Sequence, residues 1–305
     1  MTAFTDMVGC RLPLQLASLG GPIGTPALAA AVSEAGGLGT IPNPASAADV
    51  DERVSAARAA TSNPIGVGFL IPFVARDAVE AAATAAEVVE FFYGDPDRDL
   101  VQLAGARGAR VSWQVGSAGE ARAATDAGCD FVIVQGTEAG GHVRGRQRLD
   151  ELLAQTLEQV DVPVVAAGGV GTAERLNALL DAGAAGVRVG TRFVVAEESD
   201  AHPEYVARLL DASAEDTVLT GAFAVGWPDA PHRVLRSAQD AAEGYDGDTV
   251  GALAGGAIPR LAPVPPTRAT EGEIGAMALY AGESVSHATR VQPAAEIVAE
   301  LTAST

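Results

Sequence analysis

The feature of this sequence that most restricts its fold is a repeated alternation between short apolar runs and helix-like segments. The runs are rich in valine and are apolar at successive positions, so they predict strands buried on both faces of a parallel sheet. We predict eight of them, at residues 14–17, 38–41, 65–70, 88–92, 109–115, 131–134, 164–167 and 186–189. Sheets of this kind form where helices cover the strands.

Helical patterns lie between these strands. Four predicted helices, over residues 26–35, 47–60, 117–127 and 172–182, each follow or begin with a serine or threonine that can cap the first turn. Glycine follows each of the last two, as is typical of helix C-termini. Eight such units within about 210 residues predict an α/β fold of the closed (β/α)8 TIM-barrel type. An open doubly wound sheet is the alternative, and periodicity does not distinguish the two.

The alternation stops after residue 213. Residues 214–274 contain few periodic apolar runs and many chain breakers, including the proline-rich stretch 263–266. We therefore expect a barrel built from residues 1–213 plus 275–305. Residues 214–274 would be a smaller substrate-side subdomain over the barrel mouth, or else an extended loop. Segments 273–280 and 293–301 have helical patterns and are predicted to return to the barrel.

The chain contains no lysine, and all 20 of its basic residues are arginine. Schiff-base aldolases, pyridoxal-phosphate enzymes and Walker-type nucleotide hydrolases need a lysine amine at the reacting centre, so all three classes are excluded. The net charge of -19 argues against nucleic acid or an anionic membrane as a partner. We therefore expect a small-molecule substrate.

Metal binding and export also lack support in the sequence. Cys10 and Cys129 are the only cysteines, and the four histidines show no metal-ligand spacing. Residues 1–12 include Asp6 and lack the basic and apolar regions of a signal peptide. No apolar run approaches the roughly 20 residues that span a bilayer. We expect a cytoplasmic protein without a metal.

Two glycine-rich loops follow the seventh and eighth predicted strands. Gly168 and Gly169 end the first strand of this pair, and Gly190 and Thr191 end the second. Backbone N–H groups in such loops can bind an anion without a basic side chain, and neighbouring loops of this kind form the usual phosphate site of a barrel. A dinucleotide fingerprint is disfavoured because Glu174 occupies its third glycine position.

A third glycine-rich loop carries a histidine and follows the sixth strand. His142 lies among several glycines after Gln135, at the predicted catalytic rim of the barrel. A loop histidine without an apolar face should titrate near neutral pH, which suits general acid–base chemistry. We expect Glu138 to orient backbone or cap a helix. The other histidines (His202, His232 and His287) are expected to be structural or exposed, and Arg144, Arg146 and Arg148 to form a solvated face.

These loops resemble the signatures of the nitronate monooxygenase family, also called 2-nitropropane dioxygenases. The run Glu138-Ala139-Gly140-Gly141-His142 is the most specific piece, and the similarity extends over nearly the whole chain. The resemblance implies a barrel that holds FMN at the carboxyl ends of its strands. The residues placed at the cofactor by this resemblance are Leu19, Gly20, Phe69, Gln135, Gly140, Gly141, Gly168, Gly169, Arg188, Gly190 and Thr191. Arg188 would help to stabilise negative charge on reduced flavin.

The resemblance implies oxidation of alkyl nitronates, or of nitroalkanes, with O2 to a carbonyl compound and nitrite, with His142 as the catalytic base. Relatives with the same loop use NAD(P)H to reduce quinones or enoyl thioesters, and that activity is the main alternative. A non-catalytic flavin-binding protein and a flavin-free phosphate-sugar barrel are two further alternatives. The sequence leaves a homodimer open.

Overall fold

Eight parallel strands form the barrel of this protein. The structure is a computed structural model that describes residues 1–303. The barrel strands are β1 (Leu14–Leu16), β2 (Gly39–Pro42), β3 (Ile65–Leu70), β4 (Val88–Phe92), β5 (Arg110–Val115), β6 (Phe131–Gln135), β8 (Val164–Ala167) and β9 (Gly186–Val189). Their order is β1-β9-β8-β6-β5-β4-β3-β2. A parallel bridge between Gln15 and Leu38 joins the two ends of this sheet. The predicted TIM barrel is therefore confirmed, and the open sheet is wrong.

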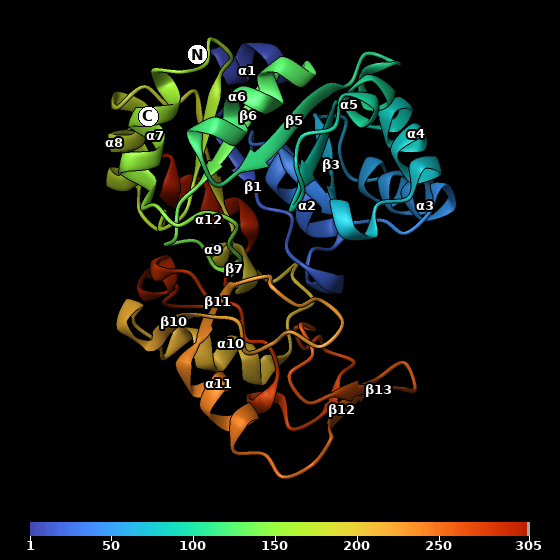
Figure 1. The fold of residues 1–305 in the computed structure, drawn as a ribbon, viewed down its shortest axis with the longest axis vertical. Coiled ribbons are helices and arrows are strands. Elements are labelled where there is room, and N and C mark those ends of the chain that lie inside the picture. Colours follow the sequence, from blue (N-terminus) through green and yellow to red (C-terminus); the bar gives the residue numbers. More distant parts are fainter. Residues whose placement is uncertain (304–305) are drawn as a thin grey trace.

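Helices cover the outside of the barrel (Figure 1). They are α2 (Pro26–Glu34), α3 (Ala47–Arg58), α4 (Arg76–Ala85), α5 (Arg98–Gly105), α6 (Ala118–Ala127), α7 (Leu149–Leu157), α8 (Ala173–Asp181) and α12 (Ala294–Leu301). The predicted caps are present at four of them, because the hydroxyls of Thr25, Ser46, Ser117 and Thr172 each accept a first-turn N–H. At the amino end of the strands, α1 (Ala3–Val8) closes the barrel, and its Phe4 packs edge-on against Phe131.

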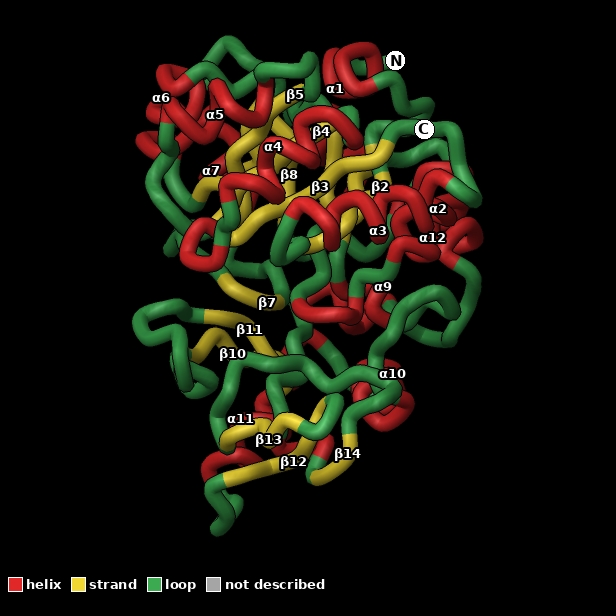
Figure 2. The backbone as a smooth tube through the Cα atoms, turned by 90° about the vertical axis from the view of Figure 1, so that its right-hand side faces the viewer, coloured by secondary structure: helices red, strands yellow, loops and turns green. Residues whose placement is uncertain are grey.

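A second lobe lies below the barrel in Figure 1 and contains two small antiparallel sheets. One sheet consists of β10 (Thr217–Thr220), β11 (His232–Leu235) and β7 (Gly141–His142), and the other of β13 (Gly256–Pro259), β12 (Thr249–Leu253) and β14 (Glu271–Gly272). Two helices, α10 (Pro203–Leu210) and α11 (Arg236–Glu243), accompany them. In Figure 2, β7 lies between the barrel and β11. The loop that follows β6 thus connects the two lobes.

The segment after the second sheet differs from the prediction. The helix predicted over 273–280 is wrong, because only the short 3-10 helix η4 (Ile274–Ala276) forms there, and it packs against α10 and α11. The helix predicted over 293–301 is confirmed as α12, which contacts α2 and α8. The second lobe thus draws in segments on both sides of 214–274, and the division into domains stays a prediction. Every helix within residues 1–303 is too short or too polar to span a bilayer.

Candidate active site

One cavity lies at the carboxyl ends of the barrel strands, facing the second lobe. Its volume is about 1250 Å³ including space open to solvent, and all eight barrel strands or the loops directly after them contribute to its lining. All twelve residues that the sequence predicted for the site line it, namely Leu19, Gly20, Phe69, Gln135, Gly140, Gly141, His142, Gly168, Gly169, Arg188, Gly190 and Thr191. Since ligands of (β/α)8 barrels bind at this end of the strands, the location is that of an active site.

The paired glycine loops lie side by side because β8 and β9 are neighbours in the sheet. Gly168 and Gly169 have φ angles of 122° and 69°, a backbone conformation that side chains with a Cβ rarely adopt. After β9, Gly190 leads into the single-turn helix α9 (Thr191–Val194). Both loops therefore present main chain to the cavity, as an anion-binding loop requires.

The loop after β6 comes very close to the chain that returns from the second lobe. A Cβ on Gly140 would lie 2.5 Å from the backbone nitrogen of Gly282, so only glycine fits there without displacement. The same Gly282 N–H donates to Thr191 Oγ1 at 3.0 Å. Gly140, Thr191 and Gly282 thus join three segments that are distant in sequence into one wall of the cavity.

The imidazole of His142 lies among aromatic rings. It stacks on the indole of Trp227, with ring centroids 4.1 Å apart and an interplanar angle of 25°, and the rings of Tyr93, His232 and Tyr280 surround it. Burial and, secondly, the neighbouring His232 lower the pKa of His142 to about 3. The expectation of a near-neutral titration is therefore wrong, because this loop histidine does have an apolar face to pack against. The ring is neutral at physiological pH, and its Nε2 is buried without a hydrogen-bond partner in the described part of the chain.

His232 is structural, as predicted, and its ring lies beside that of His142 with centroids 5.3 Å apart. It pairs with His142 across β7 and β11 and is completely buried. Its Nε2 accepts the N–H of Phe223 at 3.2 Å, which assigns the proton to Nδ1, within 2.9 Å of the Ala230 carbonyl oxygen. Burial lowers its pKa, so a neutral ring in one tautomer supports His142. No local pattern marks His232, since β7 and β11 are far apart in sequence.

The other two histidines agree with the prediction. His202 accepts the N–H of Glu204 at 3.1 Å and caps α10, which is a structural role. His287 is exposed. Neither residue lines the cavity.

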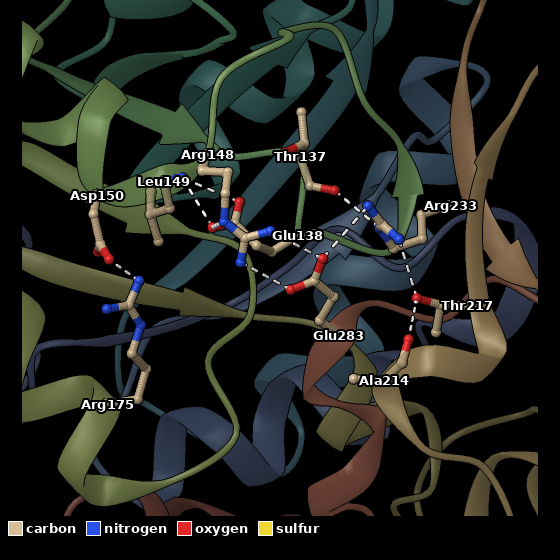
Figure 3. Close-up of polar contacts among 10 residues, drawn as sticks. All are labelled: Thr137, Glu138, Arg148, Leu149, Asp150, Arg175, Ala214, Thr217, Arg233 and Glu283. Carbon is tan, nitrogen blue, oxygen red and sulfur yellow. Dashed lines mark hydrogen bonds and ion pairs between the residues drawn. The ribbon is translucent and has the colours of Figure 1, made fainter.

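A network of charged side chains joins the loop after β6 to the second lobe (Figure 3). Glu138 caps α7 as predicted, because both of its carboxylate oxygens accept the N–H of Leu149, at 3.1 and 3.0 Å. Arg148 and Arg233 both reach Glu283, with closest ion-pair N–O distances of 3.1 and 3.6 Å. We call these three residues, Arg148, Arg233 and Glu283, the interlobe clamp.

The arginines predicted to form a solvated face are in part ion-paired. Arg148 is exposed but belongs to the clamp. Arg144 pairs with Asp95 and Glu120, so its charge is largely compensated. Arg146 is exposed, as predicted.

A buried ion pair that the sequence did not predict lies at the base of the cavity. Glu90 and Arg188 line it, are only 3% and 6% exposed, and form a bidentate pair in which Arg188 Nη2 donates to Glu90 Oε1 at 2.6 Å. Gln15 Nε2 and Ser18 Oγ donate to the same carboxylate at 2.7 and 2.6 Å. Glu90 therefore accepts four hydrogen bonds.

The fold and the site together define a (β/α)8 barrel whose ligand cavity combines paired glycine loops with a loop histidine. Within this class, the chain belongs to the nitronate monooxygenase family, whose model matches residues 1–78 and 70–304.

Three known proteins illustrate the similarity. Nitroalkane oxidase from Streptomyces ansochromogenes superposes with a TM-score of 0.82 at 31% identity, over 99% of this chain and 97% of that one. Nitronate monooxygenase from Pseudomonas aeruginosa is 32% identical over 71% of this chain and 76% of its own length. The (3aS,4S,5R,7aS)-5-hydroxy-7a-methyl-1-oxo-octahydro-1H-indene-4-carboxyl-CoA dehydrogenase of Rhodococcus jostii is 33% identical over 77% of this chain. The chain spans 66% of the length of this dehydrogenase.

Proposed function

We propose that this protein is an FMN-dependent oxidoreductase that oxidises alkyl nitronates with O2 to a carbonyl compound and nitrite. The observation that carries the proposal is that the paired glycine loops and the ring of His142 line the same cavity. If the loops bind the phosphate group of a cofactor, the rest of the cofactor lies in the cavity beside the imidazole.

The residues of the cavity suit the phosphate of FMN. Backbone N–H groups at Gly168, Gly169, Gly190 and Thr191 would hold it, since glycine lets a phosphate oxygen approach the main chain closely. Backbone donors can replace a lysine, and this chain contains none.

The residues of the cavity also suit the flavin ring. Gln135 Nε2 donates to the carbonyl oxygen of His142 at 2.9 Å, whereas Gln135 Oε1 is buried without a partner among residues 1–303. A buried acceptor that lacks a donor costs free energy, so a ring N–H of the cofactor is a suitable partner. Leu19 and Phe69 add apolar surface for the ring system.

The lowered pKa of His142 favours nitronates over neutral nitroalkanes as substrates. An imidazole with a pKa of about 3 is a poor acceptor for the α-proton of a nitroalkane, because general bases work best with a pKa near the working pH. A nitronate has already lost this proton. When bound, FMN supplies the electron acceptor for the substrate, and the neutral imidazole of His142, which lines the cavity, would orient the anion by a hydrogen bond. The lowered pKa therefore argues against the predicted role of His142 as a base toward nitroalkanes.

The test is oxygen uptake by the FMN-loaded protein with an alkyl nitronate and with the parent nitroalkane. We expect FMN to co-purify and nitronate to be oxidised much faster than nitroalkane. His142→Ala should lose at least about tenfold in kcat/KM, the lower end for a hydrogen bond to a charged group. His202→Ala is the matched control, since His202 caps α10 outside the cavity. Equal rates in wild type and His142→Ala would contradict the catalytic role of His142. Absence of oxygen uptake with either substrate in the wild type would favour a non-catalytic flavin-binding protein.

An NAD(P)H-dependent reductase of quinones or enoyl thioesters is the second candidate. One observation favours it: the Rhodococcus jostii relative, 33% identical to this chain, is a dehydrogenase of a CoA thioester. Anaerobic mixing with NADH or NADPH separates the two activities. Rapid bleaching of the flavin would support the reductase, and absence of bleaching would support nitronate oxidation.

A further inference from the structure

The Glu90–Arg188 ion pair crosses the interior of the barrel. Three strands separate β4, which carries Glu90, from β9, which carries Arg188, in each direction around the sheet. The two side chains thus come from opposite sides of the barrel and meet in its centre. Gln15, which is in register with Arg188 on the neighbouring strand β1, also donates to Glu90.

Stability alone does not explain a charged pair at this place. The interior layers of (β/α)8 barrels are filled mainly by branched apolar side chains. Removing two charges from water is costly, and replacing a buried ion pair by apolar residues of similar volume is often neutral or stabilising. A role toward whatever occupies the cavity is therefore the better explanation for Glu90 and Arg188.

The pair has no net charge toward the cavity that both residues line. Arg188 carries a permanent positive charge, and Glu90 is its only hydrogen-bond or ion-pair partner on the guanidinium among residues 1–303. Four donors surround the Glu90 oxygens, a pattern that suits a carboxylate, which is an acceptor only. Arg188 would act on a bound ring as a free cation only if Glu90 were absent.

We propose that Glu90 is a positioning residue that holds the Arg188 guanidinium beside bound FMN and compensates its charge, so that the pair sets the reduction potential of the flavin. This inference rests on the FMN-binding part of the proposed function and not on the substrate. A two-electron reduction of FMN that takes up one proton adds one negative charge to the ring system. A free cation nearby stabilises that charge, and a free carboxylate destabilises it.

Substitution of Glu90 and substitution of Arg188 should shift the flavin reduction potential in opposite directions. In Glu90→Gln the charge of Arg188 is no longer compensated, so reduced flavin gains at least about tenfold in stability over oxidised flavin, which is about 30 mV upward for a two-electron couple. In Arg188→Gln the carboxylate is left without its cation, and the potential falls. The double variant restores neutrality and returns close to the wild-type potential.

The experiment is a reductive titration of the FMN-loaded variants against reference dyes, without substrate. Glu300→Gln is the matched control, because Glu300 pairs with the equally buried Arg192 and neither residue lines the cavity. We expect this control to keep the wild-type potential.

Potentials that are equal in all variants, or shifts of the same sign in both single variants, would overturn the inference. So would a folded double variant whose potential departs from wild type by about 30 mV or more, because the neutral double variant should match the neutral pair. If the wild-type protein binds no FMN, the proposed function itself fails, which is a separate outcome.

Discussion

The imidazole of His142 lies nearly flat against the indole of Trp227, although the two residues are far apart in sequence. His142 follows barrel strand β6, and Trp227 lies in the connection between β10 and β11. The indole also contacts Tyr93 and Phe73, which extend from the barrel, with ring centroids 4.8 and 5.1 Å away. These aromatic contacts close the junction of the lobes beside His142 and shield much of its ring, including Nε2, from water.

We predict that Trp227→Ala raises the pKa of His142 from about 3 toward its ordinary value of 6.5. Burial is the main cause of the lowered pKa, and loss of the indole readmits water to the ring, which stabilises its charged form. NMR titration of the histidine side chains measures this change directly.

Trp227→Phe is the control for this variant, because it keeps an aromatic ring at the same place and should give a much smaller rise. The same pKa in wild type and in Trp227→Ala would contradict the idea that the indole shields His142.

The second prediction concerns stability against acid. The pKa of His142 lies below its unfolded value of 6.5, so the unfolded chain binds the proton first as the pH falls. The contribution of neutral His142 to the free energy of unfolding is therefore fully present above about pH 6.5, and it decreases as the pH falls from 6.5 toward 3. Between pH 7.5 and 4.5, this group alone accounts for a loss of roughly 3 kcal/mol in the free energy of unfolding.

Urea unfolding of wild type and His142→Gln at these two pH values tests the second prediction. The variant should lose less stability than wild type on acidification. His202→Gln, which lacks a histidine outside the cavity, should behave as wild type. An identical loss in all three proteins would show that His142 is not held neutral in the folded state.

The interlobe clamp gives the third prediction. Arg233 Nε donates to the carbonyl oxygen of Thr137 at 2.9 Å, and Arg233 Nη1 donates to Thr217 Oγ1 at 3.1 Å (Figure 3). Arg233→Met removes these bonds and the ion pair with Glu283, so we expect a loss of about 1–3 kcal/mol in the free energy of unfolding. FMN affinity should fall as well, because the loop from Thr137 to His142 loses its support.

Chemical denaturation and flavin fluorescence measure these two effects of Arg233→Met. Arg208→Met is the control, since within residues 1–303 the Arg208 guanidinium forms only an exposed ion pair with Glu204 one helical turn away. Its loss should cost about 0.5 kcal/mol or less in the free energy of unfolding. If Arg233→Met changed the free energy of unfolding and the FMN affinity as little as this control, the interlobe clamp would not stabilise the loop from Thr137 to His142.

The strands, the helix caps and the glycine loops could be predicted because each depends on residues close together in sequence. Val164 to Ala167 is a continuous apolar run directly followed by Gly168 and Gly169, so the pattern of a buried strand and a loop can be recognised from these residues alone. Once strands are known to be parallel, their carboxyl ends must lie together, which places His142 and Gly190 at one cavity.

What could not be predicted depends on pairs that only the closed structure brings together. Glu90 is a single carboxylate in an otherwise apolar strand, and its meaning follows from Arg188 across the barrel. His232 and Trp227 belong to the second lobe, whose sheets pair segments far apart in sequence. The lowered pKa of His142 arises from burial against these neighbours. The near-neutral pKa predicted from the loop sequence alone was therefore wrong.

The last prediction separates the cofactor site from the fold. A Cβ on Gly20 would meet no atom within 4 Å, and the φ of Gly20 is -60°, so Gly20→Ala fits the backbone without strain. Gly20 lines the cavity, however, and its extra methyl group enters space that we assign to FMN. We expect the stability of the cofactor-free protein to stay within about 0.5 kcal/mol of wild type, as for a tolerated substitution, while FMN affinity falls.

Gly221→Ala is the matched control for Gly20→Ala, because a Cβ at Gly221 also meets nothing but lies outside the cavity. It should leave both stability and FMN affinity unchanged. Gly140→Ala provides the opposite case, since its Cβ would lie 2.5 Å from the Gly282 nitrogen and should destabilise the cofactor-free protein itself. If Gly20→Ala bound FMN as tightly as Gly221→Ala, the cofactor would not reach the loop after β1, and the assignment of Leu19 and Gly20 to the flavin site would be wrong.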